Sequence, residues 1–559
     1  MSTAVSIINS ASGAVDFRKE MNVIHNIVDE CEREIALMNQ VHDFVYSGER
    51  VSMINRLQVL SRRPNDENLR NVSQLNAVNL DFVKQNIWAE YWRKVTDMTG
   101  ALLIMPAERR DQWRSQFTLG VQKTVKKDRG GFDRQVEEFV GVPEFTADTV
   151  IPTMTTLLND RHKYLAERVY GLFKALSPTH KTNKTYGFSE KLIISYCVTD
   201  FWNQSITLNY HKSDVIDDLR VMLHFFAHKE FITLNSCTEM LSAAYRAHNC
   251  ETGQWMNVDG NLMRVKIFKN GNAHFEIHPD VAWKLNEVLA YSMPAAIPAP
   301  CRSAPKTKAP KEFGYIQKTI SAKTRMLIRD RRHNSANETW YFSDSSLQKT
   351  EIQDLERTLS FIGGVKISGS WKFPYEPTAT FDNIVSMGVI PEVKSHQFYP
   401  TPAPIAQYVA QILKCQPTDQ ILDPDAGRGD LVAYLDVPAE NITSVEISPL
   451  FCDILSAKGF NVYNKDFLVW SKEFIAAPGY DKIAINPPYS EGRAKEHTLA
   501  ALNHLNEKGI MAAVLPAGYK PEEWISDEFT CHKTDREFSR EFEDTGITVA
   551  VFEFQRVEM

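Results

Sequence analysis

The sequence predicts an α/β protein in which a C-terminal domain, built on a mostly parallel sheet, follows a mostly helical N-terminal region. From His396 to the C-terminus, short β-rich runs such as ITSVEIS and KIAINPP alternate with helical runs, which is typical of βαβ units and a parallel sheet. Before residue 291, apolar residues recur at helical spacing instead. The final run, GITVAVFEFQ, follows a short connection and is expected to pair antiparallel.

Two apolar stripes predict long helices in residues 1–291, the mostly helical N-terminal domain. They comprise Phe17, Met21, Ile24, Val28, Cys31, Ile35 and Met38, and Met154, Leu158, Leu165, Val169, Leu172 and Leu176. We expect both stripes to pack inside this domain, and dimerisation through the N-terminal helices is the alternative. Further along, Asn270-Gly271 between two alternating apolar runs predicts a β-hairpin over residues 264–277.

A proline-rich stretch, residues 292–314, separates this domain from the rest of the chain. Its five prolines among small and basic residues cannot build a core and predict an extended linker. Residues 315–395 are expected to form a small, mixed α/β middle segment with a basic start. A phosphate-binding surface and a solvated face explain these charges equally well. The candidate contacts to DNA are Lys318, Lys323, Arg325, Arg329, Arg331 and Arg332.

Composition limits the classes of function. A chain of 559 residues predicts roughly two to four domains. The formal net charge of −7 excludes a protein that binds nucleic acid by overall basic charge, so any such contact must come from a local patch. The eight cysteines are scattered and show no metal-ligand spacing, which favours reduced thiols and predicts no metal. No run is long enough to span a membrane and the N-terminus lacks a secretion signal, so we expect a soluble, cytoplasmic protein.

The stretch ILDPDAGRGDL predicts one side of a ligand site. It ends a strand at Asp423 and turns through Gly427 and Gly429, where missing side chains let the backbone approach a ligand. The next strand ends at Glu446, where a carboxylate can reach ribose hydroxyls. The third ends at Asp466-Phe467, which can accept from an adenine amino group and stack on its ring. Together these strand ends predict a nucleoside-shaped site, and the absence of G-x-G-x-x-G argues against a dinucleotide.

The tetrapeptide Asn486-Pro487-Pro488-Tyr489 closes the fourth strand and predicts the reaction. An exocyclic amino nitrogen is a poor nucleophile because its lone pair is delocalised into the ring. Two acceptors, the Asn486 side-chain oxygen and the Pro487 carbonyl, would hold its hydrogens and localise that lone pair. Pro487 and Pro488 stiffen the loop, and Tyr489 is expected to offer a face to the base. No cysteine adjoins the motif, which argues against carbon-5 chemistry on cytosine.

These motifs make the C-terminal third resemble class I S-adenosylmethionine-dependent methyltransferases, most closely bacterial N6-adenine DNA methyltransferases. QFYPTPAPIAQYVAQIL resembles the helix-leading cofactor motif of that family, with Tyr399 and Thr401 in place, and NPPY resembles its catalytic motif. The resemblance implies a Rossmann-like, seven-stranded, mostly parallel sheet over residues 396–559, S-adenosylmethionine as cofactor and direct transfer without a metal. It implies that Tyr399, Thr401, Asp423, Gly427, Gly429, Glu446, Asp466 and Phe467 hold the cofactor, and that Asn486, Pro487, Pro488 and Tyr489 hold the target.

The N-terminal half resembles an uncharacterised domain of phage and mobile-element proteins, through ALSPTHKTNKTYGFSEKLI and RVKIFKNGNAHFEI. This resemblance implies a phage or mobile-element setting in a bacterial host cell and no biochemical role of its own. Together with the methyltransferase resemblance, it implies DNA modification for such an element, with protection against host restriction as one role. The chain departs from the family because no target-recognition domain lies between the motifs or after them. The same tetrapeptide serves enzymes that methylate a guanine amino group of RNA or a protein glutamine amide. A non-catalytic, cofactor-binding anti-restriction or regulatory protein is the remaining alternative.

Overall fold

The computed structural model describes most of the chain and leaves short segments out. The described residues are 17–46, 79–99, 105–127, 133–175, 187–188, 191–202, 204–227, 237–293, 297–304, 317–342, 347–392, 398–475, 479–542 and 546–557, with residues 50, 53, 56 and 102. The extreme N-terminus, residues 305–314 of the expected linker and the expected boundary between residues 395 and 396 lie outside these ranges. Within them, no helix is long and apolar enough to cross a membrane.

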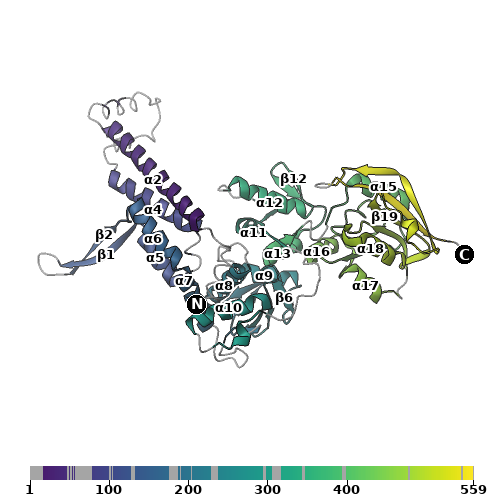
Figure 1. Ribbon diagram of the computed structural model, residues 1–559, viewed down its shortest axis with the longest axis horizontal. Coiled ribbons are helices and arrows are strands. Elements are labelled where there is room, and N and C mark those ends of the chain that lie inside the picture. Colours follow the sequence, from purple (N-terminus) through teal and green to yellow (C-terminus); the bar gives the residue numbers. More distant parts are fainter. Residues whose placement is uncertain are drawn as a thin grey trace. The chain divides into compact units, whose positions relative to one another are not determined.

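The chain divides into two compact units, and each unit is built from three separate segments of the sequence. The first comprises residues 1–192, 218–231 and 279–304, and the second comprises residues 193–217, 232–278 and 305–559. Two segments that the sequence assigns to the N-terminal domain, 193–217 and 232–278, are therefore in the same unit as the expected methyltransferase domain. Figure 1 shows both units and labels some elements of each.

The first unit is mainly helical. Its described elements are α2 (Phe17–Tyr46), α4 (Leu80–Thr99), α5 (Ala107–Gln116), the hairpin β1 (Gly120–Lys127) and β2 (Asp133–Val140), α6 (Ala147–Asn159), α7 (Arg161–Ala175), the second half of α8 (Tyr210–Phe226) and α10 (Pro279–Ser292). Ile24, Val28 and Cys31 of the first stripe are buried, which confirms that this part of it packs inside the protein. The second stripe is buried from Met154 to Leu172, the helix is interrupted at Asp160, and Leu176 lies outside the described residues.

The first part of the expected linker is ordered, and the prediction of an extended chain is wrong there. Ile297 is buried, and the short 3₁₀ helix η3 (Ala299–Arg302) follows it. The Asn286 side chain donates to the Cys301 carbonyl at 3.0 Å, which fixes this segment against α10. The buried Ile297 and the prolines at the start of η3 therefore hold this segment within the first unit, although its overall composition predicts an extended chain.

Residues 193–278 contain more strand than the sequence predicted. The expected hairpin is confirmed as β7 (Met263–Ile267) paired antiparallel with β8 (Ala273–Ile277), with Gly271 at φ 81° in the turn. It belongs to a four-stranded sheet of order β3-β8-β7-β6, and a second pair, β4-β5, lies in the same region. The unpredicted elements are β3 (Lys191–Ile194), β4 (Val198–Trp202), β5 (Ser205–Leu208), α9 (Cys237–Ala247) and β6 (Trp255–Val258).

The middle segment is mixed α/β, as expected. Its elements are β9 (Gln317–Thr319), α11 (Ala322–Arg329), β10 (Arg332–Asn334), β11 (Thr339–Tyr341), α12 (Lys349–Phe361), β12 (Val365–Ile367), β13 (Ser370–Lys372), α13 (Thr378–Met387) and β14 (Val389–Pro391). Strands β10 to β13 form one antiparallel sheet of order β10-β11-β13-β12, and β9 pairs with β14. The apolar side chains of this segment share a core with residues of α16 (Pro449–Ala457).

Helix α13 connects three parts of the second unit through two consecutive residues. Asp382, 1% exposed, accepts two hydrogen bonds from Arg246 of α9 at 2.7 and 2.8 Å and one from Arg331 at 3.2 Å. The next residue, Asn383, donates to Asp453 of α16 at 2.7 Å. Since a buried carboxylate needs charged or hydrogen-bonding partners, the two arginines neutralise Asp382 and hold the helix in place.

Two of the expected DNA contacts are structural. Arg325 is buried, and its guanidinium donates to Asp259 at 3.0 Å and to the backbone carbonyls of residues 385 and 386. Arg331 is bound to Asp382, as described above. These two side chains are engaged inside the unit, so the prediction that they contact DNA is wrong. Arg329 pairs with its neighbour Asp330, whereas Lys318 and Arg332 are exposed.

The C-terminal domain contains one seven-stranded sheet of order β17-β16-β15-β18-β19-β21-β20. The pairs from β17 to β19 are parallel and those of β21 are antiparallel, so the sheet is mostly parallel with an antiparallel end, as the sequence predicted. Helix α15 covers one face, and α17 and α18 cover the other (Figure 1). The elements are α15 (Ala403–Leu413), β15 (Ile421–Asp423), η4 (Ala439–Asn441), β16 (Ile442–Glu446), α16, β17 (Asn461–Asn464), α17 (Phe467–Glu473), β18 (Tyr480–Ile485), η5 (Ser490–Gly492), α18 (Arg493–Leu502), β19 (Leu505–Pro516), η6 (Pro521–Glu523), β20 (Phe529–Ser539) and β21 (Thr548–Arg556).

We predict that Asp382→Asn lowers the free energy of unfolding by about 3 kcal/mol, because it leaves two partly buried arginines without their carboxylate. Calorimetric melting measures the change. The matched control is Glu523→Gln, which removes one member of the exposed Lys520–Glu523 pair and should change stability by less than about 0.5 kcal/mol. Equal effects of the two substitutions would contradict the bracing role of Asp382.

Candidate active site

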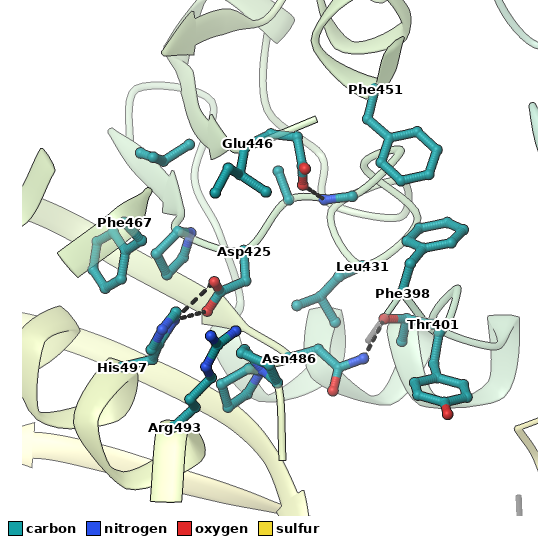
Figure 2. A pocket seen from close by; sticks show the side chains of 18 of the residues that line it. Phe398, Thr401, Asp425, Leu431, Glu446, Phe451, Phe467, Asn486, Arg493 and His497 are labelled. Atoms are coloured by element: carbon teal, nitrogen blue, oxygen red, sulfur yellow. Dashed lines mark hydrogen bonds and ion pairs between the residues drawn. The ribbon is translucent and has the colours of Figure 1, made fainter. Parts of the chain in front are cut away.

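A cavity of about 470 Å³ lies at the carboxyl edge of the sheet, between the segments that follow β15, β16 and β18. In open parallel sheets this edge is where ligands bind. Most residues that the sequence singled out line it: Tyr399, Thr401, Gly427, Glu446, Asp466, Phe467, Asn486, Pro487, Pro488 and Tyr489. Figure 2 shows the side chains of this wall. Residues that are far apart in the sequence therefore meet around one volume.

Glu446 is held rigidly at the end of β16. One carboxylate oxygen accepts from the Gly427 backbone N–H at 2.8 Å and the other from the Ser448 N–H at 2.7 Å. Burial raises the pKa of Glu446 to about 7, although these backbone hydrogen bonds oppose the rise. Each carboxylate oxygen has a further lone pair, so the group can still accept from two hydroxyls.

Asp423 and Gly429 lie behind the wall of the cavity. Asp423 is fully buried, and both of its carboxyl oxygens lack a side-chain partner among the described residues. Burial, with the nearby charges of Asp425 and Glu446, raises its pKa well above the usual range. Gly429 has φ 76°, and a Cβ there would lie 2.9 Å from the Phe460 ring, so this glycine serves the tight turn and its packing.

Asp466 and Phe467 begin α17 at the opposite end of the wall. Asp466 is the N-cap residue, and its side chain accepts from the Val469 N–H at 3.1 Å. Phe467 is 3% exposed, and its ring centroid lies 5.7 Å from that of His497. The cap thus fixes the direction of the Asp466 carboxylate toward the helix while the residue still borders the cavity.

Asn486 has a fixed orientation at the end of β18. Its Nδ2 donates to Thr401 Oγ1 at 3.1 Å (Figure 2). This hydrogen bond fixes the orientation of the amide group, so that Oδ1 is available as an acceptor. The Tyr489 hydroxyl donates to this Oδ1 at 2.8 Å and lies 3.2 Å from the Val514 carbonyl oxygen. Sequence reasoning expected Tyr489 to offer its ring to a base. In the structure its ring packs against the cores on the sheet, and its hydroxyl orients Asn486.

Sequence reasoning missed the charged pair of Asp425 and His497. His497 Nδ1 lies 2.8 and 3.0 Å from the two Asp425 oxygens, and both side chains line the cavity (Figure 2). Burial alone would disfavour the charged imidazole, but the charge and hydrogen bonds of Asp425 outweigh it and raise the pKa of His497. No local motif signalled the pair, because His497 lies 72 residues after Asp425 in the chain.

A second missed residue, Arg428, ties the cavity to the middle segment. Its guanidinium donates to the carbonyls of Ser360 at 3.1 Å and Phe361 at 2.8 Å, which end α12, and pairs with Asp430 at 3.1 Å. Cations at a helix C-terminus are favourable because the last carbonyls lack partners there. Beside it, the rings of Phe398 and Phe451 lie 4.3 Å apart and form part of the wall.

Comparison with known proteins gives one family match and several distant structural likenesses. Residues 120–295 match the family described as a domain of unknown function (DUF4942), which confirms the expected resemblance of this region to an uncharacterised domain. No curated protein sequence matches the chain.

Similar solved structures include two whose descriptions name a methyltransferase and one described as TrmN. They are a putative RNA methyltransferase from Pyrococcus horikoshii (23% identity, 29% of this chain and 88% of that chain, TM-score 0.21), TrmN from Thermus thermophilus (15%, 38% and 70%, TM-score 0.23) and a precorrin-6y methyltransferase from Geobacter metallireducens (16%, 28% and 88%, TM-score 0.22). With likenesses this distant, the chemistry must be argued from the residues of the site.

We predict a pH-dependent stability difference between the wild type and Glu446→Gln. The folded protein holds the Glu446 proton more tightly than the unfolded chain does, so this contribution is present at low pH and is lost as pH rises through about 7. The unfolding free energy of the wild type, relative to Glu446→Gln, should fall by about 3 kcal/mol between about pH 4.5 and about pH 7.5.

Denaturant unfolding at several pH values measures this difference. The control is Glu440→Gln, which replaces an exposed acid just before the same strand and should show a flat difference. A difference that does not change with pH in Glu446→Gln would contradict the raised pKa.

Proposed function

We propose that the C-terminal domain transfers a methyl group from S-adenosylmethionine to the N6 amino group of adenine in DNA. The observation that carries the proposal is the fixed Asn486 amide, which borders the same cavity as the rigid Glu446 carboxylate. This arrangement places an acceptor for an amino group next to an acceptor for sugar hydroxyls. The proposed transfer needs both of these acceptors in one cavity.

The residues of the cavity fit the proposed cofactor. Glu446 retains lone pairs for two ribose hydroxyls, and Asp466 with Phe467 offers a carboxylate and an apolar wall to the base. At Gly427 the backbone forms the wall itself, since a Cβ there would lie 2.8 Å from Phe398. The cavity volume of about 470 Å³ is within the range of small-molecule sites. When bound, the cofactor supplies a methyl group on a positively charged sulfur.

Asn486 and Pro487 are proposed to orient the amino group that accepts the methyl. Tyr489 occupies one acceptor position of Asn486 Oδ1 and leaves the other for an amino hydrogen. The Pro487 carbonyl would take the second hydrogen, which turns the nitrogen lone pair toward the methyl donor. The gain comes from a preorganised dipole and from orientation, so no covalent intermediate with the protein is required.

Adenine in DNA is the proposed target because of the resemblance of the FYPTP and NPPY motifs to N6-adenine enzymes. The exposed Lys318 and Arg332 of the middle segment are the remaining candidates for phosphate contacts, with Lys323 and Arg329 beside them in sequence. An enzyme of this type must take the base out of the stack before it reacts. We propose that the protein acts for a phage or mobile element, and protection from host restriction is the proposed role.

We predict that the purified protein forms N6-methyldeoxyadenosine in unmethylated plasmid DNA supplied with S-adenosylmethionine. Asn486→Ala should lower the yield by at least about 10²-fold because it removes a preorganised acceptor. Cofactor affinity should be largely kept. Mass spectrometry of nucleosides measures the product and calorimetry measures binding. The matched control is Asn503→Ala, an exposed asparagine at the end of α18, which should behave as the wild type.

Two outcomes would contradict this proposal in different ways. An unchanged rate in Asn486→Ala would overturn the assignment of the site. Methylation of RNA or of a protein glutamine amide, with none of DNA, would overturn the substrate and keep the chemistry.

A further inference from the structure

The Asp425–His497 pair is a contact between two side chains of the cavity wall to which the proposed reaction gives no role. Asp425 lies in the loop that follows β15, and His497 lies on α18, the helix that follows the Asn486 loop. Both border the cavity, and Figure 2 shows their side chains pointing toward each other. Their contact therefore joins the proposed cofactor loop to the proposed target loop.

We propose that this pair sets how strongly the cavity prefers the positively charged S-adenosylmethionine over its uncharged-sulfur product, S-adenosylhomocysteine. The inference rests on the proposed function. The two ligands share the adenosine and the amino acid ends and differ in the methyl group and in the charge on sulfur. Any residue that changes the net charge of the cavity therefore acts on their ratio of affinities.

The charge of the pair depends on one proton. With His497 protonated, the pair is neutral and Asp425 exerts little attraction on a cation. With His497 neutral, the carboxylate is uncompensated and favours the sulfonium. His497 is 6% exposed, so water screens this change poorly.

The other charged groups around His497 do not duplicate this switch, with the exception of Glu446. Asp466 at the start of α17 and Arg493, one turn earlier on α18, face His497 with opposite charges. Arg428 and Asp430 form their own ion pair, and Lys465 pairs with Glu473. Glu446 also borders the cavity and titrates near neutral pH, so its charge adds to the same ratio, and the contribution of the pair is therefore isolated in the Glu446→Gln background.

The test compares the dissociation constants of S-adenosylmethionine and S-adenosylhomocysteine by calorimetry, from about pH 6 to about pH 9, which brackets the range of histidine titration. In the wild type, the preference for S-adenosylmethionine should rise by about tenfold as His497 loses its proton. In the Glu446→Gln background, which removes the other cavity carboxylate that titrates near neutral pH, His497→Gln should hold the ratio at its high-pH value throughout. Asp425→Asn should hold it at the low-pH value. Titration of the ligands themselves is the same for every variant.

Proton release provides a second readout. Binding of the cation should displace the proton from His497, so S-adenosylmethionine should release more protons than S-adenosylhomocysteine in buffers of different ionisation enthalpy. This excess should vanish in both variants. His532→Gln, an exposed histidine on β20, is the matched control and should behave as the wild type, and Glu446→Gln should keep the pH-dependent ratio.

The outcomes separate this inference from the proposed function. If the wild type binds neither ligand, the proposed function fails. If it binds both with a ratio that does not change with pH, or if His497→Gln and Asp425→Asn shift the ratio in the same direction, the role of the pair is overturned. A flat titration of the wild type overturns the role of the pair even if a variant fails to fold, and the Glu446→Gln variant separates the pair from Glu446.

Discussion

The parallel pairing of β15 with β18 is the constraint on which the site depends. Leu422 of β15 lies opposite Ile483 of β18, and the strand order reverses here, with β16 outside β15 and β19 outside β18. The connections that leave such a pair diverge to opposite faces of the sheet and open a crevice between them. The glycine loop and the Asn486 loop therefore share one cavity.

The second unit is braced by charge as well as by packing. Asp382 and Asn383 sit side by side on α13, and they bind arginines on one side and a carboxylate of α16 on the other. Asp453 has a pKa raised to about 7 by burial, although its hydrogen bond with Asn383 opposes the rise. Arg428 adds a third link from the cavity wall to the end of α12. The wall of the cavity is thus attached to the middle segment through Arg428.

The sequence predicted the features that depend on neighbouring residues. The strand-ending motifs, the hairpin around Gly271, the buried stripes and the mostly parallel sheet all follow from local spacing. Features that depend on partners far along the chain were missed. Arg325 looked like part of a basic surface because its partner, Asp259, is 66 residues away. His497 gave no signal because Asp425 is 72 residues away, and Ile297 showed only in three dimensions that the proline-rich stretch packs.

The shared core of the middle segment and the C-terminal domain determines where this chain can be divided. Phe398, Leu450, Phe451 and Ile454 of the C-terminal domain are buried in one cluster with Leu359, Ile362 and Phe381 of the middle segment. A fragment that begins at residue 398 would present these side chains to water as a contiguous apolar surface, and the carbonyls that bind Arg428 would be absent. Surfaces of this kind promote self-association. The smallest fragment that keeps this cluster covered therefore includes the middle segment.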